Sequence, residues 1–127
     1  MPVAMRVYPS TRYATEADRP VLDARIELFD QMNDSIKGVG RFRFELFAGD
    51  DRTAAQLARR LYRWDVNLHT LAQQRQYYDP VTRSYQFRLQ IDDLSIAQKA
   101  TLLEVTYLPL EGQRLETKAV IARASEE

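Results

Sequence analysis

Apolar and polar side chains alternate strictly along residues 22–28 and again along residues 41–46. The apolar positions share one face of each segment: Leu22, Ala24, Ile26 and Leu28 in the first, and Phe42, Phe44 and Leu46 in the second. A period of two is typical of a β-strand with one buried face. Residues 30–40 between them are polar, contain two glycines and are too many for a two-residue hairpin turn. We therefore expect either a longer hairpin loop or a crossover between two sheets.

The alternating pattern returns in the second half of the chain. It predicts four more strands, at residues 62–68, 84–91, 103–107 and 115–121. The Asp79-Pro80 pair before the second of these is typical of a tight turn, because proline fixes φ and aspartate bonds its own backbone. This indicates a hairpin that begins at Tyr77 and Tyr78.

The remaining segments give weaker patterns. Residues 4–8 predict a short first strand, and the polar residues 9–20 predict a loop or an edge segment. Apolar residues at helical spacing predict a short helix near residues 51–61. Residues 96–100 predict one irregular or helical turn. Together these elements indicate a mainly β protein, an antiparallel β-sandwich of about seven to eight strands, with a closed barrel as the alternative architecture.

Length and composition limit the class of protein. A chain of 127 residues is one domain by length, and we assign residues 1–127 to a single sandwich with a folded core at 4–122 and a frayed tail at 123–127. Eighteen basic residues balance eighteen acidic ones, which argues against nucleic acid as a partner. The absence of cysteine excludes disulfides and thiol catalysis. We expect no membrane insertion by this segment, because no apolar run approaches about 20 residues.

Three stretches resemble the bacterial immunoglobulin-like and prealbumin-like domains. They are ARIELFDQMNDSIKGVGRFRFEL, YYDPVTRSYQFRLQ and LLEVTYLPLEGQRLET, although Arg83 and Ser84 stand where these families usually carry glycine. The whole is similar to soluble domains of uncharacterised envelope lipoproteins. The resemblance implies accessory, adhesive or assembly roles and no catalytic residues. It also implies the cell envelope or periplasm as the compartment, with the cytoplasm as the alternative; if the protein is exported, its signal or anchor is not within these residues.

Acidic residues and the single histidine are the candidate metal ligands of this chain. Asp30 and Asp34 fall in one loop, and calcium prefers oxygen ligands from flexible loops, as in C2 domains. Aspartate also favours turns, and the EF-hand spacing is absent. His69 has no second histidine or cysteine to complete a zinc site. We therefore expect no cofactor and no metal, with Asp30 and Asp34 as the weak candidates, and calcium binding no tighter than about millimolar.

Aromatic residues of this chain are candidates either for the core or for an exposed binding surface. Trp64 shares the apolar face of residues 62–68, so we expect it to anchor the core between the sheets. Alternation instead turns four aromatic positions outward or leaves them ambiguous, which makes them candidates for an interaction surface: Phe29, Phe47, Tyr77 and Tyr78. An exposed aromatic platform is also what a carbohydrate-binding module needs.

No nucleophile with a base and an orienting group can be assembled from the motif spacing, so we expect no enzyme. We expect a non-enzymatic, accessory protein-interaction module of an envelope or surface protein; a C2-like or carbohydrate-binding module is the alternative. The partner would be another protein or a second copy of the chain. One terminal strand, at residues 4–8 or 115–121, is expected at a sheet edge where a partner can add a strand; otherwise both ends pair only within a monomer.

Overall fold

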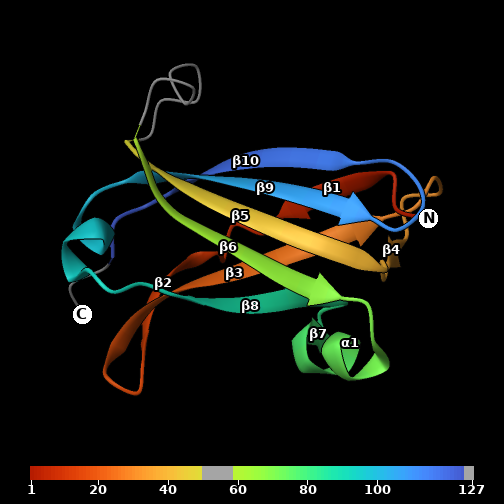
Figure 1. The fold of residues 1–127 in the computed structure, drawn as a ribbon, viewed down its shortest axis with the longest axis horizontal. Coiled ribbons are helices and arrows are strands. Elements are labelled where there is room, and N and C mark those ends of the chain that lie inside the picture. Colours follow the sequence, from red (N-terminus) through yellow and green to blue (C-terminus); the bar gives the residue numbers. More distant parts are fainter. Residues whose placement is uncertain (50–58, 125–127) are drawn as a thin grey trace.

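The computed structural model describes residues 1–49 and 59–124 and shows two antiparallel sheets packed face to face (Figure 1). Sheet A contains β1 (Ala4–Val7), β2 (Arg12–Glu16), β3 (Arg19–Phe29), β4 (Ser35–Ile36), β7 (Tyr78–Asp79) and β8 (Ser84–Gln90). Sheet B contains β5 (Gly40–Ala48), β6 (Arg60–Leu68), β9 (Thr101–Pro109) and β10 (Leu115–Ile121). The predicted mainly β sandwich is confirmed, with two separate sheets in place of the alternative closed barrel.

Sheet A is built on β3, which is long enough to pair with two strands along each of its edges. β1 and β2 pair with successive halves of one edge, while β8 and the short β4 pair with the other. Residues 12–16 therefore form the edge segment that was one of the two predicted options for residues 9–20. The second option, a loop throughout, is wrong because Thr15 and Glu16 pair with Pro20 and Arg19 across a tight turn.

Sheet B has the order β10-β9-β5-β6, with β5 hydrogen-bonded on both edges. Since β3 belongs to sheet A and β5 to sheet B, residues 30–40 form a crossover between sheets, interrupted by β4. Close packing requires glycine at Gly40, where a Cβ would lie 2.5 Å from the Leu108 carbonyl oxygen and 2.7 Å from Pro109 Cα. The edge prediction for the terminal strands is confirmed: β1 lies at an edge of sheet A and β10 at an edge of sheet B.

Aromatic side chains from both sheets fill the centre of the sandwich. Phe42 of β5 is fully buried and lies 5.2–6.0 Å, centroid to centroid, from four other rings: Phe44, Tyr85, Phe87 and Tyr107. Apolar residues of β3 and β9 enclose this cluster. The inward positions are those that the alternation predicted, because a pleated strand puts every second side chain on the same face.

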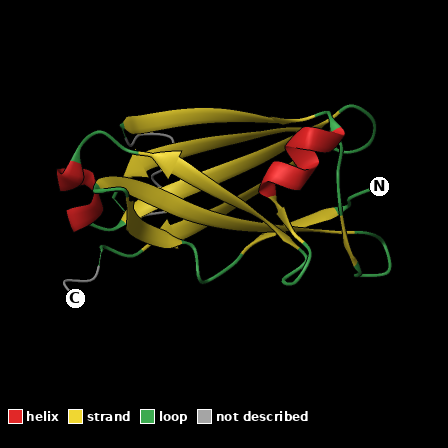
Figure 2. Ribbon diagram, turned by 90° about the horizontal axis from the view of Figure 1, so that it is seen from below, coloured by secondary structure: helices red, strands yellow, loops and turns green. Residues whose placement is uncertain are grey.

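Two short helical elements lie at opposite ends of the strands (Figure 2). The 3-10 helix η1 (Leu94–Gln98) confirms the predicted turn near residues 96–100. The helix α1 (Leu71–Tyr77) was not predicted; it begins at a capping box in which Thr70 accepts from the Gln73 backbone and Gln73 accepts from the Thr70 backbone. Most of the helix predicted at 51–61 lies outside the described residues, but Arg60 and Leu61 belong to β6, so its C-terminal end is wrong.

Trp64 lies at an edge of the core and not at its centre. It is half-buried on β6, the edge strand of sheet B, and its ring stacks on Tyr62 with centroids 5.2 Å apart. Its indole Nε1 donates to the Gln90 carbonyl of β8 at 3.1 Å, and the Tyr62 hydroxyl accepts from the Asp92 amide at 2.9 Å. Trp64 is therefore not the predicted anchor at the centre of the core. Its hydrogen bond to Gln90 instead joins the two sheets at their edge.

A polar group inside the sandwich ties α1 to the crossover. The Tyr85 hydroxyl donates to Gln74 Oε1 at 2.6 Å and accepts from the Gly38 amide at 3.1 Å. The Gln74 side-chain amide donates to the carbonyls of Gly38 and Leu68, at 2.7 and 3.0 Å. Burial raises the pKa of Tyr85 to about 12 from its usual value of 10.

Tyr85→Phe is expected to lower the free energy of unfolding by about 1–3 kcal/mol at neutral pH, because Gln74 and the Gly38 amide lose a buried partner. The parent protein should also lose stability as the pH rises from 10 to 12. The unfolded chain releases the Tyr85 proton near pH 10 and the folded chain only near pH 12, a difference of about 2–3 kcal/mol. Urea unfolding at pH 7, 10 and 12 measures both effects. A variant that loses as much stability as the parent above pH 10 would contradict this assignment.

Candidate functional site

The outer face of sheet B gathers arginines from two neighbouring strands. Alternation turns Arg41 and Arg43 outward on β5, and Arg63 and Asp65 outward on β6. The antiparallel register places Arg43 opposite Asp65. Residues directly opposite or diagonal across a ladder lie within reach of long side chains. The two strands thus bring three guanidinium groups to one carboxylate, and we call these four residues the arginine cluster.

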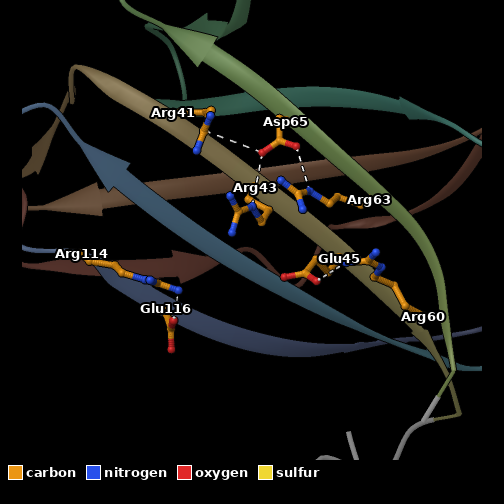
Figure 3. A network of polar contacts seen from close by, with 8 residues as sticks. All are labelled: Arg41, Arg43, Glu45, Arg60, Arg63, Asp65, Arg114 and Glu116. Carbon is orange, nitrogen blue, oxygen red and sulfur yellow. Dashed lines mark hydrogen bonds and ion pairs between the residues drawn. The ribbon is translucent and has the colours of Figure 1, made fainter. Parts of the chain in front are cut away.

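Asp65 lies at the centre of the arginine cluster (Figure 3). The Nε atoms of the three arginines approach it at 3.0 Å for Arg63, 3.4 Å for Arg43 and 3.8 Å for Arg41. Partial burial alone would raise the pKa of Asp65, but the hydrogen bonds from Arg63 and Arg43 outweigh that effect and hold the pKa below its usual value. Asp65 is therefore a carboxylate at neutral pH, and it orients the arginine side chains around itself.

One donor in the arginine cluster has no hydrogen-bond partner. The Nε atom of Arg41 is buried, yet its 3.8 Å approach to Asp65 is too long for a hydrogen bond. Within residues 1–49 and 59–124, it is the one buried side-chain nitrogen or oxygen left without a partner. Native structures satisfy nearly all such groups, so a missing acceptor here calls for an explanation.

The charges elsewhere on this face are balanced pair by pair. Arg60 binds Glu45 at 3.1 Å, and Arg114 binds Glu116 at 2.8 Å (Figure 3). Lys118 of β10 lies opposite Glu104 of β9 in the register. The arginine cluster differs because three positive charges share one negative charge. It leaves a local excess of two positive charges on a sheet face of a protein with no net charge.

Apolar residues border the arginine cluster at the end of the strands. Half-buried Leu108 of β9 lies opposite Arg41. Val39 directly precedes β5 and Leu110 directly follows β9. A backbone hydrogen bond of 3.2 Å joins them, and they are 49% and 66% exposed. Arginine is enriched at protein interfaces, and these apolar side chains add contact area beside it.

The structure does not gather the four predicted interaction residues into one patch. Phe29 is half-buried at the end of β3 in sheet A, whereas Phe47 is half-buried on the outer face of sheet B. Tyr77 and Tyr78 pack against the core: their rings lie 5.1 Å from those of Phe87 and Tyr85, respectively. Of the four, only Phe47 shares a face with the arginine cluster.

The predicted metal candidates act as turn formers. Asp30 accepts the backbone N–H groups of Met32 and Asp34 at 2.9 and 3.0 Å, which closes the turn before β4. His69 is exposed and its backbone amide bonds Gln73. Among the residues that the structure describes, no three histidine, cysteine, aspartate or glutamate side chains gather at one point. Weak calcium binding stays a prediction.

The alternation turns Arg41 and Arg43 to the polar face of their strand, but it does not by itself show the arginine cluster. The charged positions of the preceding alternating segment, Asp23, Arg25 and Glu27, lie in the other sheet and do not pair with them. The available signal was a pair of charged residues two positions apart on each of two strands. These pairs are Arg41 and Arg43 on one strand, and Arg63 and Asp65 on the next. Only the β5–β6 register turns that signal into a site.

Comparison with known proteins gives no match, whether to family models, to curated protein sequences or to solved structures. The helices that the structure describes are too short and too polar to cross a lipid bilayer.

Proposed function

We propose that this protein is a non-catalytic interaction module that binds an acidic segment of another protein on the outer face of sheet B. The observation that carries the proposal is the arginine cluster, where three guanidinium groups share one carboxylate. A guanidinium presents paired N–H donors whose geometry matches a carboxylate, so a partner's aspartate or glutamate fits this site.

Three features of the site support a carboxylate partner. The side chains of Arg41 and Arg63 are 42% and 43% exposed, so their outer N–H groups are open to a partner. The three arginines carry two more positive charges than Asp65 neutralises, and this excess attracts an anionic group of the partner. The exposed Val39 and Leu110 provide apolar contact area beside the charges, which an interface needs for stability.

The test uses a fluorescently labelled deca-glutamate peptide and measures binding by anisotropy at low ionic strength. The parent protein should bind it, and binding should weaken as salt rises, because the attraction is between exposed charges. The double variant Arg41→Gln, Arg43→Gln should bind at least about tenfold more weakly, the effect of losing one hydrogen bond to a charged group. Asp65→Asn should bind more tightly, since it removes the competing carboxylate.

The matched control is Arg88→Gln. Arg88 is an arginine on sheet A whose side chain is 57% exposed and paired with Glu16 at 3.2 Å, and its substitution should leave peptide binding unchanged. Equal affinity of the double variant and the parent would show that the arginine cluster does not bind the peptide. Binding of a single-stranded oligo-thymidine in preference to deca-glutamate would show that the partner class is wrong.

The compartment rests on the family resemblance alone. We propose that the module belongs to a bacterial envelope protein, because its strand–loop–strand segments resemble those of envelope immunoglobulin-like and prealbumin-like domains. Fractionation of the producing cell, followed by immunodetection, tests this placement. Recovery in the cytosolic fraction would contradict it.

A further inference from the structure

The outer face of sheet A contains a pocket of about 620 Å³ that no prediction from the sequence had placed. It lies on the opposite sheet from the arginine cluster, so it stands independently of the proposed function. Its floor is formed by Asp23 and Arg25 of β3, and its walls by two separate segments. Residues lining the walls are Tyr8, Ser10 and Arg12 on one side, and Thr82 and Ser84 on the other.

The pocket exists because the edge of sheet A is broken between β1 and β2. At the break, the Tyr8 amide donates to the Arg25 carbonyl at 2.8 Å. The Thr11 hydroxyl then accepts the Arg25 amide at 3.0 Å, in place of a backbone carbonyl. Residues 9 and 10 are thereby released from the ladder and form a rim over the floor. The turn between β7 and β8 forms the opposite rim.

The polar groups of the pocket combine donors and acceptors that are only partly used. Asp23 accepts from the Gln86 side chain through one oxygen, at 3.0 Å. Arg25 reaches Asp79 at 3.6 Å, which is an ion pair too long for a hydrogen bond. The Arg12 guanidinium is exposed, and the described residues place no carboxylate within 4.0 Å of it and no hydrogen-bond acceptor on it.

We infer that this pocket binds a sugar unit of a glycan. Each sugar hydroxyl donates one hydrogen bond and accepts others, so it matches a site where guanidinium donors, a carboxylate acceptor and hydroxyls of Ser10 and Thr82 stand together. The Tyr8 ring in the same wall adds an apolar surface for the C–H face of a sugar ring. The volume is within the range of small-molecule sites, about 300–1,000 Å³.

A simple anion fits this pocket less well than a sugar. Arg12 and Arg25 give two positive charges, but Asp23 faces the same space and Asp79 already approaches Arg25. The positive charge is therefore largely cancelled, and Asp23 would repel a phosphate or carboxylate. A neutral polyhydroxyl ligand uses both the donors and the acceptor.

The experiment titrates the isotope-labelled protein with N-acetylglucosamine, galactose, glucose and mannose, and with inorganic phosphate, and follows backbone amide resonances. At least one sugar should shift amides of residues 8–12, 23–25 and 82–84. Arg12→Gln and Asp23→Asn should each weaken that binding about tenfold, the effect of losing one hydrogen bond to a charged group. Both changes keep the fold in place, since Arg12 is exposed and an asparagine oxygen still accepts from Gln86.

The control is Arg114→Gln, at the residue just before β10 of the other sheet, which should leave sugar binding unchanged. The inference is overturned if none of the four sugars shifts the pocket amides. It is also overturned if phosphate shifts them and the sugars do not, or if both pocket variants bind the sugar as tightly as the parent.

Discussion

Phe42→Ala is expected to lower the free energy of unfolding by about 3–5 kcal/mol, the usual range for removing a large buried ring. Phe42 is fully buried and contacts four aromatic rings, two from sheet A and two from sheet B. The sheets are each hydrogen-bonded along their strands, so the cavity cannot close without moving whole strands. Urea denaturation followed by circular dichroism measures the change.

The matched control is Phe47→Ala, on the same strand but on the outer face. Phe47 is half-buried there and does not belong to the core cluster, so its loss should cost well under half as much as the loss of Phe42. Equal costs would show that the outer face of β5 is covered as completely as the inner one. Such a result would make Phe47, one of the predicted interaction residues, a packing residue.

Deletion of residues 1–9 is expected to destabilise the protein by about 5 kcal/mol, which approaches the total stability of a small domain. The deletion removes β1, whose four residues pair with β3. Met5 and Val7 of β1 pack against the core, and each contributes about 1–2 kcal/mol when partly buried. The Phe29 and Arg25 carbonyls of β3 also lose the hydrogen bonds that the Val3 and Tyr8 amides donate to them. A thermal melt of the shortened chain gives the measurement.

Tyr8→Phe separates the pairing of β1 with β3 from the side-chain contact of Tyr8, the residue that follows β1. The Tyr8 hydroxyl donates at 2.6 Å to Glu27, a carboxylate only 7% exposed that also binds Ser35 and lies 3.7 Å from Arg6. Loss of that donor should cost about 1–3 kcal/mol. A shortened chain that melts with the parent, and loses a concentration-dependent dimer, would instead make β1 an exchangeable edge where a second copy adds a strand.

The outer edges of the sheets were predictable only in part. A short first strand followed by Pro9 indicates a weakly held end, and the structure confirms β1 at an edge. The sequence did not show that β2 continues the same edge, because the break between them depends on Thr11 replacing a backbone acceptor for Arg25. The hydrogen bond between the Arg25 amide and the Thr11 hydroxyl is a tertiary contact between residues fourteen positions apart, and it creates the pocket.

The helix α1 was missed for a different reason. Residues 71–77 have no apolar stripe at helical spacing, because residues 73–76 are all glutamine or arginine. The local signal was the capping box of Thr70 and Gln73, which involves only two residues. Its position is set by Gln74, whose amide and carbonyl groups complete the polar group around Tyr85. A hydrophobic pattern does not predict a helix whose position is set mainly by interior hydrogen bonds.

The sequence by itself determined the central residues of the long strands and which face of each of these strands is buried. Alternation carries that information because a strand's side chains point to opposite faces in turn, whatever strand lies beside it. Only the tertiary structure decided which strands are neighbours and in what register, since period-two patterns fit many pairings equally well. The pairing of Arg43 with Asp65 made three separate arginines into a cluster, and the assignment of β3 and β5 to different sheets set that cluster and the pocket on opposite faces.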